Sequence, residues 1–173
     1  MKKLLIVGGS GTIARAFLKE YYDYYDFHCI ARNERHLAEI KRDFPMVDIY
    51  TGNIENKTQL FYQFDKIRPD IVVHMAAMKH VNLVEENPIQ GAIINVQGSL
   101  NVIEACIRTD VPVTVGLSTD KACAPENVYG YTKSILESCF LESNSDRNKF
   151  ACTRFANVAL TSDSVIPLWK TLI

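Results

Sequence analysis

The stretch Leu4-Leu5-Ile6-Val7-Gly8-Gly9-Ser10-Gly11-Thr12-Ile13-Ala14 decides the fold of this chain. Its first part is a short apolar run closed by glycine, which is typical of a buried parallel strand. The pattern that follows permits a tight turn at Gly8, close approach of a phosphate at Gly11 and close helix packing at Ala14. An amphipathic helix is predicted next, over residues 12–24, so free N–H groups at its start face an anion. The stretch therefore predicts a dinucleotide site, with a plain glycine turn as the alternative.

Arg32 follows the second predicted strand, residues 27–30, about twenty residues beyond the glycine turn. An acidic residue at this place binds the ribose hydroxyls of NAD, whereas an arginine suits the 2′-phosphate of NADP. We therefore expect Arg32 and Asn33 to contact the coenzyme, with NADP favoured. The nearby Glu34 keeps NAD open, and a solvated surface arginine is the remaining alternative.

Strands and helices alternate along the whole chain. The predicted strands are residues 2–7, 27–30, 47–50, 71–74, 111–117 and 150–154. The predicted helices are residues 12–24, 34–43, 56–66, 88–109 and 128–143. This alternation favours an α/β fold, a doubly wound parallel sheet (Rossmann fold) with flanking helices. The chain has 173 residues, 47% of them hydrophobic, which suffices for one core and about one domain, residues 1–173.

Composition argues against several classes of function. The formal net charge of −1 leaves no electrostatic footprint for nucleic acid or for an anionic membrane. The apolar stretch near the N-terminus is too short for a signal peptide, and no segment approaches the length of a membrane span. The 5 cysteines are scattered and include no Cys-x-x-Cys pair. They predict reduced thiols in a cytoplasmic protein and no metal site.

A group of reactive side chains follows the predicted strand 111–117. The run Ser118-Thr119-Asp120-Lys121 is followed by Tyr129 and Lys133, which are four apart and share one face of a helix. A phenol beside a fixed ammonium can lose its proton well below its usual pKa of about 10. Such a phenolate prepares an alcohol for oxidation. The additional Asp-Lys pair indicates that oxidation is not the whole reaction, with a solvated turn as the alternative.

The predicted helices 88–109 and 128–143 carry apolar residues on more than one face. Not all of these residues can point at one sheet, and they include Ile93, Ile94, Val96, Leu100, Val102 and Ile103. We expect a homo-oligomer that covers the remainder, with burial under the chain's own loops as an equal alternative.

Four segments resemble the extended short-chain dehydrogenase/reductases, and most closely the inverting UDP-N-acetylglucosamine 4,6-dehydratases of bacterial surface-polysaccharide and flagellar-sugar pathways. They are the glycine turn 8–14, residues 74–81, residues 117–122 with Tyr129-Gly130-x-x-Lys133, and residues 154–158 with 164–167. The glycine turn is shared by many families. The Ala-Ala-Met-Lys-His-Val and Ser-Thr-Asp-Lys-Ala runs are much narrower. The resemblance extends from Leu4 to Ile173 and agrees with the fold expected above.

This resemblance implies a lyase that dehydrates a UDP-amino sugar. The C4 hydroxyl would be oxidised first, with hydride passing to the nicotinamide. Tyr129 would be the base, Lys133 would lower its pKa and hold the nicotinamide ribose, and Thr119 would hydrogen-bond the substrate hydroxyl. Lys121, as a neutral amine, would then remove the C5 proton while Asp120, as an acid, protonates the departing C6 hydroxyl. Hydride returns to C6, and C5 is reprotonated from the opposite face.

Other contacts are implied by the same matched segments. Asn53 and Ile54 would lie at the adenine, and Asn53 stands where the family usually has aspartate. Lys79 would reach the nicotinamide or the substrate, and Asn157 the substrate sugar. Asn95 would anchor the sheet near the active site, although an asparagine is often only a local cap. The complete set implied to bind the coenzyme is Gly8, Ser10, Gly11, Thr12, Ile13, Arg32, Asn33, Asn53, Ile54, Ala76, Ala77, Lys79, Tyr129 and Lys133.

The chain departs from its relatives at its end. Family members continue past Pro167 into a smaller domain that binds the nucleotide of the substrate, so that domain is expected to be missing here, with residues 160–173 as its start. Turnover is then expected to fall steeply, because remote binding energy is lost. A fragment, a degenerate gene product and a short protein completed by a partner all fit. A UDP-sugar 4-epimerase or ketoreductase of the same fold, and a non-catalytic NADP-binding or interaction module, are the alternative functions.

Overall fold

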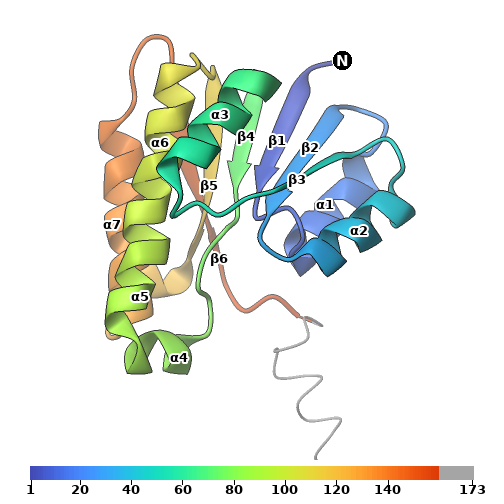
Figure 1. Ribbon diagram of the computed structural model, residues 1–173. Coiled ribbons are helices and arrows are strands. Elements are labelled where there is room, and N and C mark those ends of the chain that lie inside the picture. The colour runs from blue at the N-terminus through green and yellow to red at the C-terminus, as the bar shows by residue number, and fades with distance from the viewer. Residues whose placement is uncertain (160–173) are drawn as a thin grey trace, which may run out of the picture.

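A computed structural model describes residues 1–159 of the chain. Six parallel strands form one sheet in the order β3-β2-β1-β4-β5-β6, which confirms the doubly wound α/β fold (Figure 1). The strands are β1 (Lys3–Val7), β2 (Asp26–Ala31), β3 (Asp48–Thr51), β4 (Ile71–His74), β5 (Val113–Thr119) and β6 (Lys149–Phe155). The expectation that residues 160–173 begin a substrate region lies outside the described residues.

The helices lie on both faces of this sheet. They are α1 (Thr12–Tyr21), α2 (Glu34–Asp43), α3 (Lys57–Ile67), α4 (Val81–Glu86), α5 (Pro88–Ala92), α6 (Gly98–Arg108) and α7 (Val128–Glu142), with a π-helical segment η1 (Ile93–Gln97) and a 3₁₀ turn η2 (Asp120–Ala122). Helices α1 and α2 cover one face of the sheet, and α3, α6 and α7 cover the other (Figure 1). The predicted helix 88–109 is therefore α5 and α6 joined by a π-helical segment, and α4 was not predicted.

Side chains of the central strand β1 pack into both layers of the core. Leu4 and Ile6 pack toward α1 and α2, while Leu5 and Val7 pack toward the opposite layer. All four side chains are buried, two on each face of the strand. Removing each from water contributes roughly 1.5–3 kcal/mol to the stability of the fold. This continuous burial explains why the first strand reads as an unbroken apolar run.

The strand order places a crevice beside the carboxyl end of β1. This strand pairs with β2 on one side and β4 on the other, so the connections that leave β1 and β4 run to opposite faces of the sheet. Ligands bind at such a switch point in open parallel sheets. Within residues 1–159, no helix combines the length and apolar character that crossing a membrane requires.

Candidate active site

A cavity of about 770 Å³ opens at the carboxyl ends of the strands. Its walls come from the turn after β1, the ends of β2, β4 and β5, the start of α7 and the segment after β6. The structure brings nearly all predicted site residues to these walls. They are Gly8, Ser10, Gly11, Thr12, Ile13, Arg32, Asn33, Asn53, Ile54, Ala76, Ala77, Lys79, Thr119, Lys121, Tyr129, Lys133 and Asn157. Asp120 is the exception and does not line the cavity.

The glycine turn has the shape that a diphosphate requires. Gly8 has φ +92°, and a Cβ at this position would lie 2.5 Å from the backbone nitrogen of Ala76, so only glycine fits. A Cβ on Gly11 would meet nothing closer than the Gly8 carbonyl oxygen at 3.6 Å, which leaves open space above the turn. No side chain caps the start of α1, and its first turn contains no acidic residue. The residues present therefore fit a dinucleotide.

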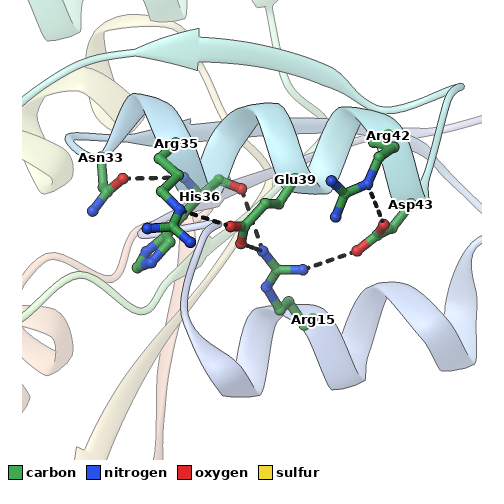
Figure 2. Close-up of polar contacts among 7 residues, drawn as sticks. All are labelled: Arg15, Asn33, Arg35, His36, Glu39, Arg42 and Asp43. Atoms are coloured by element: carbon green, nitrogen blue, oxygen red, sulfur yellow. Dashed lines mark hydrogen bonds and ion pairs between the residues drawn. The ribbon is translucent and has the colours of Figure 1, made fainter.

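Two polar side chains at the adenosine end are engaged within the protein. Asn33 accepts a hydrogen bond from the backbone N–H of His36 at 3.0 Å and so caps α2 (Figure 2). The side-chain oxygen of Asn53, a residue that the resemblance places at the adenine, accepts from the Glu55 N–H at 3.2 Å. The Asn53 amide donates to Glu55 Oε1, also at 3.2 Å. Both asparagines thus shape the ends of β2 and β3 through local turns.

An arginine on α1 fixes the two helices beside the glycine turn to each other. The guanidinium of Arg15 reaches across to α2, where it lies 2.8 Å from Glu39 Oε2 and 3.1 Å from Asp43 Oδ2 (Figure 2). It also donates to the carbonyl of His36 at 3.4 Å. Because Arg15 is only partly exposed, this network holds the N-terminal end of α1 more firmly than an isolated surface pair would.

Tyr129 and Lys133 lie one turn apart on α7 and both reach the cavity. The Lys133 ammonium donates to the carbonyl of Leu117 at 2.8 Å, and only 4% of the residue is exposed. Burial lowers the pKa of Lys133 to about 8. The pKa of Tyr129 is raised above its ordinary value, mainly by burial, although a hydrogen bond with Thr119 opposes this.

The expectation that Lys133 lowers the pKa of Tyr129 is therefore not met in the structure. The reason is geometric: the ammonium is held by a backbone carbonyl of β5, and burial acts on the phenol more strongly than any neighbouring cation. Tyr129 is therefore a neutral phenol in the structure.

Asn95 connects the loop after β4 to α7. This fully buried side chain accepts from the Met78 N–H at 2.8 Å and donates to the Met78 carbonyl at 3.0 Å. Its amide also donates to Thr132 Oγ1 at 3.1 Å, and Thr132 Oγ1 donates to the Tyr129 carbonyl at 2.8 Å. The anchoring role expected for Asn95 is thus a contact between the Ala76–Lys79 loop and the helix of Tyr129. Asn95 lies in η1, and π-helical segments are frequent at functional sites.

Thr119, Asp120 and Lys121 form a tight polar group at the end of β5. Thr119 Oγ1 donates to Asp120 Oδ1 at 2.8 Å, and the Lys121 ammonium lies 3.3 Å from the same oxygen. The hydrogen bond from Thr119, followed by that from Lys121, lowers the pKa of Asp120. Asp120 is therefore a carboxylate here, with 54% of its side chain exposed.

The last strand brings a substrate-side residue to the same group. Asn157 follows β6 and accepts a hydrogen bond from the Lys121 ammonium at 3.4 Å. Two hydrogen bonds from Arg154 to Glu137 on α7, at 2.9 and 2.7 Å, hold the end of β6 in place. The positions of Asn157 and Tyr129 are therefore linked through α7.

Several cavity residues were not predicted. His80 and Ser118 line the cavity, as does Phe155 at the end of β6. His80 and Ser118 directly precede or follow predicted residues, and Phe155 lies in the matched segment 154–158, so adjacency was the available signal for all three. Among residues 1–159, no group of three or more histidine, cysteine, aspartate or glutamate side chains could hold a metal ion.

Comparisons with known proteins agree with this geometry. Residues 4–173 match the family described as Polysaccharide biosynthesis protein. The chain is 35% identical to UDP-N-acetylglucosamine 4,6-dehydratase (inverting) of Campylobacter jejuni, over 99% of this chain and 54% of that protein. It is 31% identical to a UDP-glucose 4-epimerase of Rickettsia canadensis, over 97% of this chain and 52% of that protein. The chain thus spans about half the length of these curated relatives.

Solved structures show the same fold. The X-ray structure of Pen from Bacillus thuringiensis has a TM-score of 0.92 and 32% identity, covering 99% of this chain and 55% of that one. The enzyme WbmH of Bordetella bronchiseptica, solved in complex with NAD⁺, has a TM-score of 0.85 and 21% identity, covering 99% of this chain and 62% of that one. At that identity the second likeness is one of fold alone.

Proposed function

Because the chain belongs to the polysaccharide biosynthesis protein family, we propose that it holds the coenzyme site and the reacting side chains of an NADP-dependent lyase acting on a UDP-amino sugar. One observation carries this proposal: a single cavity is lined by the glycine turn, by Tyr129 and Lys133, and by Lys121. A module that only binds nucleotides does not need the last three side chains. The substrate class follows from the C. jejuni relative, named a UDP-N-acetylglucosamine 4,6-dehydratase.

The first step requires a base beside the C4 hydroxyl of the sugar. A nicotinamide coenzyme, when bound, would supply the acceptor for hydride from C4 of the sugar and the donor of hydride to C6. Thr119 Oγ1 holds the hydroxyl, and Tyr129 takes its proton. The Lys133 ammonium, on the same face of α7, stabilises the resulting phenolate. Burial raises the pKa of Tyr129, and a positive charge close to the phenol would lower it.

The elimination step requires a second base and an acid. Asp120 and Lys121 form an ion pair at 3.3 Å that is one proton transfer away from this state. Moving one proton from the ammonium to the carboxylate gives a neutral amine, which removes the C5 proton, and a carboxylic acid, which protonates the departing C6 hydroxyl. The ion pair is regenerated when water leaves. Bound substrate favours the neutral pair, because excluding water penalises separated charges.

The remaining cavity residues hold the substrate. Lys79 and Asn157 lie on the walls near the ends of β4 and β6, and Asn157 already contacts Lys121. We assign both to the sugar and its neighbouring groups.

The direct test of the proposed function is product analysis. The chain is incubated with NADP⁺ and UDP-N-acetylglucosamine, and the nucleotide sugars are analysed by mass spectrometry. We expect a product that is lighter than the substrate by one water. Coenzyme binding without any product from UDP-sugars would contradict the proposal and favour a binding module.

Lys121→Ala should abolish exchange of the C5 hydrogen with solvent. Removing the amine leaves no base at C5, so we expect deuterium incorporation from D₂O to fall by a factor of about 10² or more. The measurement is the isotope content of recovered substrate and product. Lys19→Ala, an exposed lysine on α1, is the matched control and should exchange normally. Undiminished exchange in Lys121→Ala would exclude Lys121 as the base.

A UDP-sugar 4-epimerase is the second candidate, because Asp120 does not line the cavity. Epimerisation needs the phenol and Lys133 but no acid at C6. The relative from R. canadensis, named a UDP-glucose 4-epimerase, has comparable identity to this chain. An epimerised product with unchanged mass would select this function.

Arg32→Asp should reverse the coenzyme preference. The arginine supplies a cation for the 2′-phosphate, whereas an aspartate repels that phosphate and accepts from a ribose hydroxyl. We expect the Kd for NADPH to rise about 10²-fold, the scale of losing a charge-assisted contact, while NADH binds no more weakly than before. Coenzyme fluorescence titrations measure both constants. An unchanged ratio would show that Arg32 does not read the phosphate.

We propose that the chain forms a homo-oligomer. Exposed apolar side chains occur along α5 and α7, namely Ile89, Tyr131, Ile135 and Leu141. A second copy of the chain that buries them through helices 88–109 and 128–143 is the partner we propose.

All five cysteines are free thiols, which supports our proposal of a cytoplasmic protein.

A further inference from the structure

Glu55 places a carboxylate beside the arginine that faces the coenzyme. The residue lies between β3 and α3, just outside the cavity wall formed by its neighbours Asn53 and Ile54. Glu55 Oε1 is 3.7 Å from Arg32 Nη1, and 25% of the Glu55 side chain is exposed, against 60% for Arg32. The carboxylate is thus the better fixed member of the pair.

Two side chains, those of Asn53 and Gln90, hold this carboxylate in place. The Asn53 amide donates to Oε1 at 3.2 Å, and the Gln90 amide on α5 donates to Oε2 at 3.3 Å. The Glu55 N–H is itself bound by Asn53 Oδ1. Neutral donors therefore fix the two oxygens, while Arg32 supplies the one cation that the described residues offer them. A charge held in this way acts on whatever binds to Arg32.

Arg32 is also the arginine at this end of the cavity that a coenzyme can reach. Arg35 follows closely in the sequence, but its guanidinium lies 3.2 Å from Glu39 and does not line the cavity (Figure 2). Figure 2 shows that Glu39 also binds Arg15, so Arg35 belongs to the network between α1 and α2. Recognition of a 2′-phosphate therefore depends on Arg32, and Arg32 is shared with Glu55.

We propose that Glu55 is a specificity-determining residue that competes with the coenzyme's 2′-phosphate for Arg32 and so weakens the preference for NADP over NAD. This inference rests on the proposed coenzyme site. A phosphate monoester carries nearly two negative charges at neutral pH. Binding it requires Arg32 to leave the carboxylate, or requires two like charges to share one cation. NADH presents only hydroxyls at this place and meets neither obstacle.

The test is a comparison of two coenzymes on four variants. NADPH and NADH are titrated by fluorescence against the unmodified chain, Glu55→Gln, Arg32→Ala and the double variant. Glu55→Gln keeps the shape and removes the charge. We expect its Kd for NADPH to fall three- to tenfold and its Kd for NADH to change less than twofold. In the Arg32→Ala background the same change should alter NADPH binding less than twofold, because Glu55 acts through Arg32.

Glu34→Gln is the matched control. Glu34 lies two positions from Arg32, and within the described part of the chain its side chain has no ion-pair partner, so the variant removes the same charge without breaking a contact. If Glu34→Gln gains as much NADPH affinity as Glu55→Gln, the effect comes from the net negative charge of this region and not from the contact with Arg32. That result would overturn the proposal. An unchanged or weaker NADPH affinity in Glu55→Gln, or an equal gain without Arg32, would overturn it as well.

A second variant covers the case in which Glu55→Gln does not fold. Glu55→Asp keeps the charge but shortens the reach to Arg32, so NADPH binding should tighten relative to NADH, and an unchanged ratio would overturn the proposal. Failure of the unmodified chain to bind either coenzyme would instead contradict the proposed function. Binding of both coenzymes with no effect of Glu55 would contradict this inference alone.

Discussion

Replacing Gly8 by alanine is expected to destabilise the fold by about 2–4 kcal/mol and to abolish coenzyme binding. Gly8 has φ +92°, which is strained for a residue with a side chain, and its Cβ would lie 2.5 Å from the Ala76 nitrogen. That contact is with backbone, so no side chain can move aside. Displacing the loop after β4 would widen the turn and separate Ala76 from the cavity wall. Urea denaturation and NADPH titration measure the two effects.

Gly11→Ala separates the two effects of the first variant. Gly11 has φ −76°, and its Cβ would meet nothing nearer than 3.6 Å, so stability should change by less than about 0.5 kcal/mol. Coenzyme affinity should still fall, because the added methyl group occupies the path of the diphosphate. A Gly8→Ala chain that is as stable as Gly11→Ala would show that the turn can relax and would contradict the first prediction.

Replacing Lys133 by methionine is expected to stabilise the fold while it removes the reaction. Burial lowers the pKa of Lys133 from 10.5 to about 8, so keeping this ammonium buried at pH 7 costs about 3 kcal/mol. Loss of the hydrogen bond to the Leu117 carbonyl offsets about 1 kcal/mol of that amount. A net gain of about 1–3 kcal/mol at pH 7 is therefore expected. Oxidation at C4 should fall by a factor of about 10² or more, because the phenolate loses its cation.

The pH dependence gives this prediction a distinct signature. Between pH 8 and 10.5 the unfolded chain keeps the Lys133 proton that the folded chain has released, so this lysine makes stability rise with pH across that window. The advantage of Lys133→Met should therefore shrink from pH 8 upward and vanish before pH 10.5, because the lost hydrogen bond then outweighs what remains of the charge penalty. Lys149→Met, at an exposed position, should show neither effect. A gain that stays constant over this range would mean that packing, and not the buried charge, is responsible.

Local sequence patterns predicted the strands and most of the helices well, because each of these elements depends mainly on residues close together in the sequence. The apolar run of β1 and the glycine turn depend on contacts within a few residues. Helix α4 was missed because six residues are too few to reveal a helical periodicity. The π-helical segment was missed because it accompanies the binding of Asn95 to Met78 and Thr132, which are distant in the sequence.

In the candidate site, too, the sequence predicted which residues are present but not how their side chains pair. Matched segments identified which residues meet at the cavity, since the strand order brings their ends together. They could not show that Asp120 and Lys121, although adjacent and ion-paired in a 3₁₀ turn, differ in their access to it: Lys121 lines the cavity and Asp120 does not. Nor could they show the pairing of Arg32 with Glu55, whose residues are joined only by the packing of β2 beside β3.

The number of residues in the π-helical segment before α6 matters for the site. Deleting one residue from Ile93–Gln97 would let the helix continue with regular α geometry, and no hydrophobic residue need be lost. The side chains on either side of the deletion would keep nearly the same orientation to each other, because a π-helical turn holds about one residue more than an α-helical turn. Asn95 lies inside the segment, so its contacts with Met78 and Thr132 depend on the extra residue. A deletion here therefore endangers the link between the loop after β4 and α7 while it leaves the rest of the helix in place, and relatives of this chain should tolerate substitutions at the other positions of this segment more readily than deletions.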